Sequence, residues 1–275
     1  MRKLFLVGCP RSGTTWLQII LGSHSHVATV RETHLFHWYV TGLYAQWQAE
    51  ERHVSKDGLR ILLTPADFDL ACRQFADVVF DKIETWNPGA EILLEKTPDH
   101  LKSWRIIRRL YPDALFLHLV RDPRAVACSL LAFGRETWGQ GAPRDVTEAA
   151  LFWRTNVRIG RDELPQLGTN YLEVRYEDLS SRPDEVLGRI CSWLAIPPLR
   201  YDPERFSIEQ LRTRRTVGEP ALPSWEDREN FFRRGAPDGW QTELSPDQIE
   251  TVELLCDDLM KDFGYAPHEP AGARH

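Results

Sequence analysis

Leu4-Phe5-Leu6-Val7-Gly8-Cys9-Pro10-Arg11-Ser12-Gly13-Thr14-Thr15-Trp16 is an apolar run that ends in a loop bounded by glycines and continues as a helical pattern. The apolar residues before Gly8 predict a buried strand, and the pattern from Thr14 to Leu21 predicts a helix that ends at Gly22. Backbone N–H groups at the start of such a helix converge on one point, where the helix dipole also favours an anion. This strand, loop and helix therefore predict an α/β fold with a phosphate-binding loop.

The glycine spacing almost matches the phosphate-binding loop of nucleotide triphosphatases, G-x-x-x-x-G-K-[ST]. Thr15 follows the second glycine as required, but Thr14 stands where that loop has lysine, and the cation lies inside the loop at Arg11. In a triphosphatase the lysine reaches the β- and γ-phosphates beside Mg²⁺. Its loss argues against cleavage of a metal-bound triphosphate and favours a different phosphate ligand. A glycine-rich turn that binds no ligand is the alternative.

Length, charge and cysteine usage exclude several classes of protein. The 275 residues can form one large α/β domain with a full core, and the net charge of −6 offers no basic footprint for nucleic acid or an anionic membrane. The apolar run before the loop is only a strand long, so we expect neither a signal peptide nor a membrane span. The 5 cysteines are scattered and form no C-x-x-C pair, which indicates reduced cysteines in a cytoplasmic protein.

Candidate catalytic side chains follow two of the expected strands. Val27–Val30 is β-like and leads into a segment in which, if extended, Glu32 and His34 point to one face. A carboxylate or an imidazole can remove the proton of a hydroxyl or amine. Residues 91–95 form the next expected strand, and Lys96 follows at its carboxyl end, where open α/β sheets bind ligands. A solvated polar strand end remains the alternative for each of these residues.

The clearest central strand is residues 114–120, and Arg121 follows it directly. Asp122 and Pro123 are explained as the N-cap and the first residue of the next helix. Helix initiation does not explain Arg121, whose guanidinium suits bidentate binding of phosphate. We expect His118, inside the strand, to be a core histidine.

These separated stretches together resemble the sulfotransferases that use 3′-phosphoadenosine 5′-phosphosulfate (PAPS), in the family's order from Leu4 to about Tyr265. The loop is similar to P-[KR]-[SG]-G-T-[ST]-W, which in the family wraps the 5′-phosphosulfate, and Arg121 with Ser129 is similar to the pair that holds the 3′-phosphate. Tyr176 takes the place of a tyrosine near the adenine, and residues 231–240 resemble the stretch that closes over the 3′-phosphate. The resemblance implies these PAPS-binding residues: Arg11, Ser12, Gly13, Thr14, Thr15, Trp16, Arg121, Ser129, Tyr176, Arg233, Arg234 and Gly235.

The resemblance also implies catalytic roles. The stretch that starts at Glu32 is similar to Glu-x-His-x-Phe of carbohydrate sulfotransferases, where the glutamate is the base, and Glu-Lys-Thr-Pro places Lys96 near the transferring sulfuryl group. Cytosolic sulfotransferases of animals have a histidine base where this sequence has Pro98. That departure strengthens Glu32 as the base and leaves His34 and His100 as lesser candidates.

From the residues and the resemblance together we expect a P-loop-like, three-layer α/β fold with a central, mostly parallel sheet flanked by helices. We expect one sulfotransferase domain over residues 1–265, a helical excursion at 38–90 that shapes the acceptor pocket, and a disordered tail at 266–275.

The implied function is metal-independent transfer of a sulfuryl group from PAPS to a hydroxyl or amine of a small-molecule or carbohydrate acceptor, releasing 3′,5′-adenosine diphosphate. The rivals are a nucleotide or small-molecule kinase with a degenerate loop and a non-catalytic nucleotide-binding protein. The sequence leaves the acceptor and the oligomeric state open.

Overall fold

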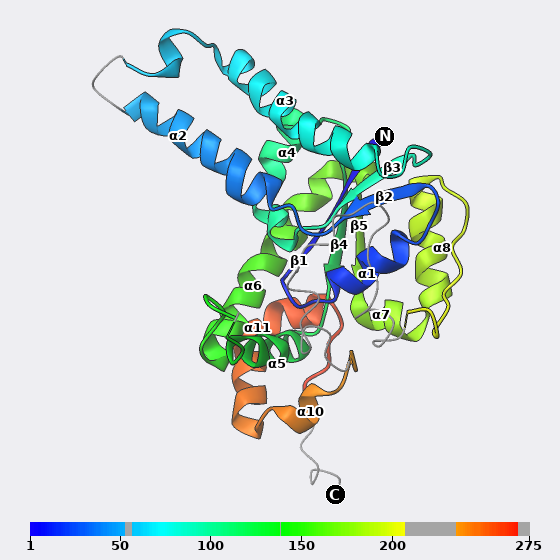
Figure 1. Ribbon diagram of the computed structural model, residues 1–275. Helices are drawn as coiled ribbons and strands as arrows, with labels where there is room; N and C mark the ends of the chain where they lie inside the picture. Colours follow the sequence, from blue (N-terminus) through cyan, green and yellow to red (C-terminus); the bar gives the residue numbers. More distant parts are fainter. Residues whose placement is uncertain (53–56, 138, 207–234, 269–275) are drawn as a thin grey trace, which may run out of the picture.

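The computed structural model describes residues 1–52, 57–137, 139–206 and 235–268 (Figure 1). Its strands form one five-stranded sheet in the order β2-β3-β1-β4-β5, and every neighbouring pair is parallel. The strands are β1 (Arg2–Gly8), β2 (Val27–Val30), β3 (Ile92–Glu95), β4 (Leu115–Val120) and β5 (Tyr171–Arg175). The mostly parallel sheet expected from the sequence is confirmed.

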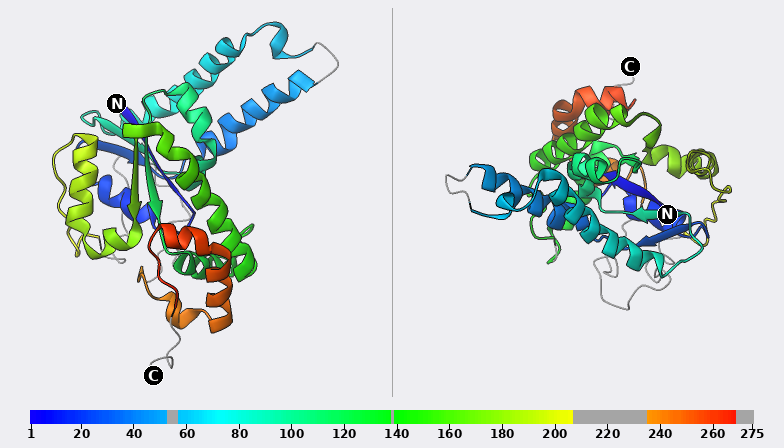
Figure 2. Two further views of the ribbon diagram at one scale, coloured as in Figure 1. Left: turned by 180° about the vertical axis from the view of Figure 1, so that it is seen from behind. Right: turned by 90° about the horizontal axis from the view of Figure 1, so that it is seen from above.

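The sheet is the middle of three layers, because its strands are apolar on both faces. Alternate residues of β1 point to opposite sides, so Phe5 packs with the aromatic core on one face while Leu4 packs with α1 and α8 on the other. Figures 1 and 2 show the helices on both sides. On the Leu4 side lie α1 (Thr14–Leu21), α7 (Tyr176–Ser181) and α8 (Pro183–Leu194), and on the Phe5 side α3 (Pro65–Glu84) and α4 (Trp104–Leu110).

Between β2 and β3 the chain leaves the sheet as a helical hairpin, which projects from the body of the molecule (Figures 1 and 2). It consists of η1 (Leu35–Val40, a π-helix), α2 (Thr41–Arg52), the short 3₁₀ turn η2 (Leu59–Ile61) and α3. Thr64 caps α3 through a capping box with Asp67. The stretch is helical, as the sequence indicates.

The helices that follow β4 pack beside the sheet and against one another. They are α5 (Pro123–Gly134), α6 (Val146–Glu163) with the 3₁₀ segment η4 (Leu164–Asn170), α10 (Trp240–Glu243) and α11 (Pro246–Asp262). Asp122 caps α5, as expected from the sequence, and Ser245 caps α11. The chain stays packed beyond the expected boundary at 265, because Arg124 donates to the carbonyl of Ala266 at 2.9 Å and the amide of His268 to Glu253 at 2.7 Å.

Two local details differ from the sequence-based expectation or sharpen it. The sequence does not foresee the 3₁₀ helix η3 (Pro98–Ser103), which precedes α4. The cysteines are all free and buried, and burial raises the pKa of Cys9 well above its usual value, so this loop residue is no thiolate nucleophile.

Among the described helices none is both long and apolar enough to cross a bilayer.

Candidate functional site

The loop between β1 and α1 leaves its polar groups available to an anion. Gly13, the N-cap of α1, has φ 95°, and no side chain of the described residues caps this helix. A Cβ at Gly13 would lie 2.6 Å from the Tyr176 ring, so only glycine fits both the backbone conformation and the space. The hydroxyl of Ser12 is buried without a hydrogen-bond partner in the described part of the chain. Uncapped helical N–H groups and a buried hydroxyl suit a phosphate group.

Lys96 joins this loop to the candidate base. It follows β3 directly and has a relative exposure of 0%, so the solvated strand-end alternative does not hold for it. Its ammonium donates to Thr15 Oγ1 at 3.0 Å and to Glu32 Oε1 at 2.7 Å. A phosphate-loop hydroxyl, a buried cation and a carboxylate therefore stand in one hydrogen-bonded row.

His34 faces the second carboxylate oxygen of Glu32. Its Nε2 lies 3.6 Å from Glu32 Oε2, as expected if the two side chains share one face. Burial lowers the pKa of His34 more than the Glu32 carboxylate raises it, so the imidazole is neutral at physiological pH. Glu32 thus lies between a fixed cation and a neutral imidazole while about a third of its side chain stays exposed.

Hydrogen bonds to Glu95 connect the two segments that carry Glu32 and Lys96. Its side chain is 1% exposed, accepts hydrogen bonds from the hydroxyls of Thr33 at 2.7 Å and Thr97 at 2.8 Å, and lies 2.6 Å from His100 Nδ1. The other ring nitrogen of His100 accepts the Phe36 N–H at 3.0 Å, so the imidazole proton lies on Nδ1 and faces Glu95. His100 is fully buried with both nitrogens engaged, which leaves it no access to an acceptor.

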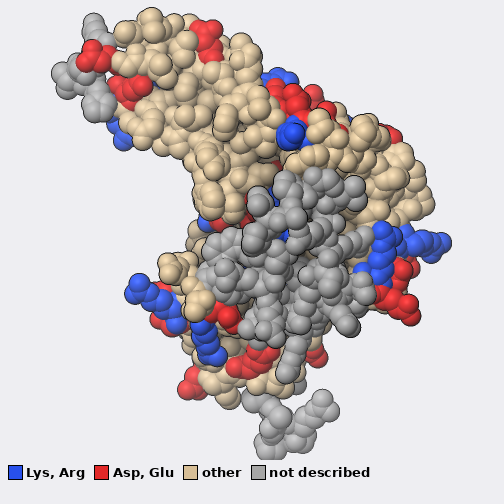
Figure 3. Space-filling model, viewed as in Figure 1, with Lys and Arg blue, Asp and Glu red and all other residues tan. Residues whose placement is uncertain are grey.

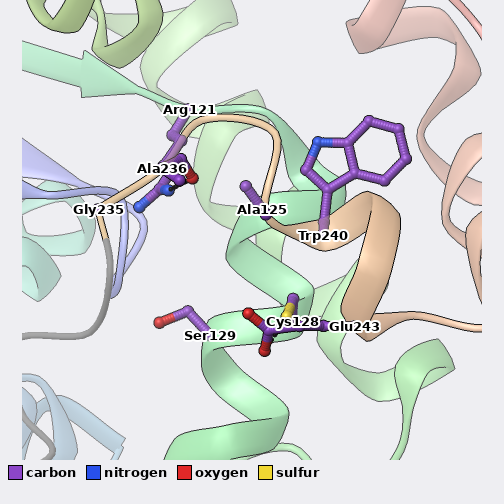
Figure 4. Close-up of a pocket in the computed structure, with 9 residues that line it drawn as sticks. Arg121, Ala125, Cys128, Ser129, Gly235, Ala236, Trp240 and Glu243 are labelled. Carbon is purple, nitrogen blue, oxygen red and sulfur yellow. Dashed lines mark hydrogen bonds between the residues drawn. The ribbon is translucent and has the colours of Figure 1, made fainter.

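A second site lies at the end of β4, where Arg121 and Ser129 face a common pocket (Figure 4). Arg121 donates to the carbonyl of Ala236 at 3.0 Å, and its buried Nε has no hydrogen-bond partner among the described residues. The pocket has an empty volume of about 350 Å³, part of it open to solvent. Its lining residues are Arg121, Ala125, Cys128, Ser129, Gly235, Ala236, Gly239, Trp240 and Glu243. A guanidinium whose Nε has no partner in the described part of the chain, together with a hydroxyl, suits a second phosphate.

The two sites adjoin one another. Arg11 Nε, from the loop, donates to Ser129 Oγ at 3.2 Å, although the residues are far apart in the sequence. The Tyr176 ring lies against Gly13, and the guanidinium carbon of Arg121 lies over the same ring, 4.1 Å from the ring centroid. Its hydroxyl donates to the carbonyl of Gly235 at 2.6 Å.

Most residues that the sequence singled out therefore come together. Thr14 is buried in the first turn of α1, and Trp16 stands 5.4 Å from the Tyr176 ring, centroid to centroid, in a tilted arrangement. Gly235 has φ 67° and borders the pocket, whereas Arg233 and Arg234 lie outside the described residues. Sequence reasoning missed the supporting role of Glu95, whose signal was a carboxylate at the end of an otherwise apolar strand.

Residues 1–52, 57–137, 139–206 and 235–268 contain no group of three or more His, Cys, Asp or Glu that could hold a metal ion. Cations, hydroxyls and backbone amides lie at both sites, and these groups suit anionic oxygens.

Comparison with known sequences points to one family. A sequence profile described as "Sulfotransferase family" matches residues 3–201. The nodulation protein NoeE of Sinorhizobium fredii (strain NBRC 101917 / NGR234) is 29% identical over 95% of this chain and 65% of its own length. Protein-tyrosine sulfotransferase A of Caenorhabditis elegans is 27% identical over 76% of this chain and 53% of its own length. The chain thus spans between about half and two thirds of the length of these relatives.

Comparison with solved structures agrees on the fold. The sulfotransferase domain from the curacin biosynthetic pathway has a TM-score of 0.56 at 19% identity, with 94% of this chain and 98% of that domain covered. The mouse sulfotransferase SULT7A1, crystallised with PAP, has a TM-score of 0.57 at 16% identity, with 96% of this chain and 86% of that protein covered. At such identities the likeness concerns the fold, and it confirms the P-loop-like architecture.

Proposed function

The chain belongs to the sulfotransferase family, and we propose on this basis that it transfers a sulfuryl group from PAPS to a hydroxyl or amine of a small-molecule or carbohydrate acceptor, releasing 3′,5′-adenosine diphosphate. The observation that carries the proposal is the buried ammonium of Lys96, which hydrogen-bonds both to Thr15 of the phosphate loop and to Glu32. This arrangement supports the proposal because the cation lies between the phosphate loop and the proposed base.

In the proposed reaction the acceptor oxygen or nitrogen bonds to sulfur while the bond from sulfur to the 5′-phosphate oxygen breaks. Glu32 takes the acceptor proton, and the electron pair of the broken bond goes to the phosphate oxygen. Lys96 and Arg11, with the N–H groups that begin α1, stabilise the charge that develops on that oxygen. Because Lys96 is held by two hydrogen bonds before the reaction starts, it needs little reorganisation.

We assign the base to Glu32 and not to the two histidines. Glu32 is part-exposed and directly bonded to Lys96, whereas His100 is enclosed by Glu95 and the Phe36 amide. His34, neutral and 3.6 Å from Glu32, orients the carboxylate in this scheme.

The second site suits the other end of the nucleotide. Arg121 and Ser129 are proposed to bind the 3′-phosphate together with Arg233, Arg234 and the backbone of Gly235, and Trp16 and Tyr176 to contact the adenosine between the two phosphates. The Arg121 Nε, which has no partner among the described residues, supports this assignment, since a buried guanidinium N–H without a partner is costly unless a ligand satisfies it. A kinase would have no use for this second anion site.

We further propose that transfer needs no metal and that the protein works in the cytoplasm. A sulfuryl group carries less charge than the triphosphate for which kinases recruit Mg²⁺, so the fixed cations of the chain can suffice. The named relatives include protein-tyrosine sulfotransferases, and a tyrosine phenol therefore belongs among the acceptors to be tested.

Thermal shift and sulfuryl transfer test the proposal together. We expect 3′,5′-adenosine diphosphate to raise the melting temperature more than ATP with Mg²⁺, because only a ligand of the native state stabilises it. Radioactive sulfur should pass from PAPS to a pool of phenols, glycosides and amines in the presence of EDTA, and Glu32→Gln should abolish transfer while keeping the thermal shift. A larger shift with ATP and Mg²⁺ would indicate a kinase, and binding without transfer would indicate a non-catalytic nucleotide-binding protein.

A further inference from the structure

Trp38 is stacked on the imidazole that faces the candidate base. Its amide donates to the carbonyl of His34 at 2.9 Å, so the first turn of η1 carries the indole back over the imidazole. The ring centroids are 3.7 Å apart and the planes differ by 8°. One face of the indole is thereby covered by His34, whose edge in turn faces Glu32.

The rest of Trp38 is open, with a relative exposure of 59% for the residue. The adjacent Tyr39 is 54% exposed and packs beside Phe75 of α3, with ring centroids 6.3 Å apart. On the face seen in Figure 3 the projecting hairpin is mostly uncharged, and acidic side chains gather toward its far end. Large aromatic side chains exposed beside a polar reaction centre are typical of a ligand-binding surface.

The stack also fixes how far this surface lies from the base. A ring on the outer face of Trp38 would lie about two stacking distances, roughly 7 Å, from the imidazole plane, with the indole between them. A single ring bound there could not present its own hydroxyl to Glu32. A second ring that is joined to the ring carrying the reacting hydroxyl could lie there, because the centres of two linked rings are separated by a distance of this order.

We propose that the outer face of Trp38 is an acceptor subsite that stacks the ring next to the one that carries the reacting hydroxyl. This inference rests on the proposed sulfuryl transfer and narrows its acceptor to a molecule with at least two linked rings. The shared chemistry is a neutral ring with an apolar face, as found in a disaccharide or in a two-ring phenol.

Matched acceptors of one and two rings test the subsite. With protein saturated with 3′,5′-adenosine diphosphate, calorimetry would compare phenol with 4-hydroxybiphenyl, and a methyl glycoside with the corresponding disaccharide. Transfer from labelled PAPS would give kcat and KM for the same pairs. We expect Trp38→Ala to weaken binding and raise KM roughly tenfold for the two-ring member of at least one pair and to leave the one-ring members unchanged. Trp38→Phe, which keeps a flat ring, should stay within about threefold of wild type.

Leu254→Ala is the matched control, because Leu254 is 77% exposed on α11, away from the hairpin. It should leave both kinds of acceptor unaffected. An equal loss for one-ring and two-ring acceptors in Trp38→Ala would overturn the subsite, since it would mean that Trp38 only supports His34. Unchanged binding of every two-ring acceptor would overturn it as well. The calorimetry decides this even if wild type transfers nothing, an outcome that would contradict the proposed function instead.

Discussion

Lys96 connects the phosphate loop to the proposed base through its hydrogen bonds. An ammonium without exposed surface is stable in a fold only when its hydrogen bonds are satisfied, and Thr15 and Glu32 satisfy them here. The arrangement fixes the cation at the loop before any ligand arrives. Burial of the ammonium costs desolvation free energy, and stabilisation of a ligand oxygen during transfer would account for that cost.

We predict that Lys96→Met lowers kcat about 100-fold or more and leaves the affinity for 3′,5′-adenosine diphosphate within a few fold. The reason is that Lys96 acts on charge that develops only during transfer, whereas the loop amides and arginines bind the ground-state nucleotide. Labelled-sulfur transfer and nucleotide calorimetry measure the two effects. Lys102→Met is the matched control, because Lys102 lies in η3, the 3₁₀ helix that follows Lys96 in the chain, and pairs with Asp99 near the surface. More than a tenth of the wild-type kcat in Lys96→Met would refute the role.

Glu95 gives a prediction for pH. Burial alone would raise its pKa, but the facing His100 and the hydrogen bonds from Thr33 and Thr97 outweigh burial and lower the pKa from 4.5 to about 2. A carboxyl group whose pKa is depressed in the folded state adds stability above its unfolded pKa and loses it as pH falls toward the folded one. The free energy of unfolding should therefore fall by about 3 kcal/mol between roughly pH 4.5 and pH 2 on account of this group.

Urea unfolding at a series of pH values measures this effect. Glu95→Gln should be less stable than wild type at pH 7 and should lose that share of the acid dependence, because an amide does not ionise. Glu250→Gln, at an exposed position on α11, should follow the wild-type curve. If Glu95→Gln kept the full acid dependence, another carboxyl group would be responsible for it.

At the scale of elements, the unit of β1, loop and α1 depends on the one backbone position at Gly13. Its positive φ admits side chains only with strain, and the Tyr176 ring from α7 fills the space a Cβ would need. A strand, a helix and a second helix from far along the chain are thus fitted together at a residue without a side chain. The fit keeps the N–H groups of α1 open to the ligand.

Gly13→Ala should lower the free energy of unfolding by about 2 to 4 kcal/mol, since it adds backbone strain and overpacks a buried ring. It should also weaken binding of 3′,5′-adenosine diphosphate, as the loop must shift. Chemical denaturation and calorimetry report the two changes. Gly42→Ala is the control: this glycine of α2 has nothing within 4 Å of its added Cβ, and alanine there should be neutral or stabilising by up to about 1 kcal/mol. A Gly13→Ala protein as stable as wild type would show that Tyr176 can move aside.

Most of the helices and strands could be predicted from the sequence, because local residue patterns determine where they begin. Asp122 before Pro123 predicts the start of α5, and the structure confirms it. The π-helix η1 and the 3₁₀ helix η3 were not foreseen. These two segments are tied together where the Phe36 amide donates to His100, so their geometry is set by a tertiary contact that no local pattern encodes.

At the scale of the whole molecule, strand order brings the two candidate anion sites together. The chain places β2 and β3 on one side of β1 and β4 and β5 on the other, so the loops after β1 and β4 leave from neighbouring strands at one edge. The sequence predicted the strands, the loop and Arg121 separately, and only the family resemblance joined them. The contact between Arg11 and Ser129, 118 positions apart, follows from that order and could not be read from spacing.

If one nucleotide spans both sites, the contribution of its 3′-phosphate to the binding free energy must depend on Arg121. We predict that wild type binds 3′,5′-adenosine diphosphate more tightly than 5′-adenosine monophosphate, and that Arg121→Ala weakens binding of the bisphosphate about 10- to 100-fold while barely affecting the monophosphate. Calorimetry with both nucleotides and both proteins gives a double-mutant cycle, which measures the coupling free energy between Arg121 and the 3′-phosphate. Arg121→Lys should recover only part of the loss, because an ammonium cannot form the bidentate contact of a guanidinium. Equal losses for both nucleotides would instead mean that Arg121 acts by holding Tyr176 and Ala236 in place, and the proposed 3′-phosphate site would have to be abandoned.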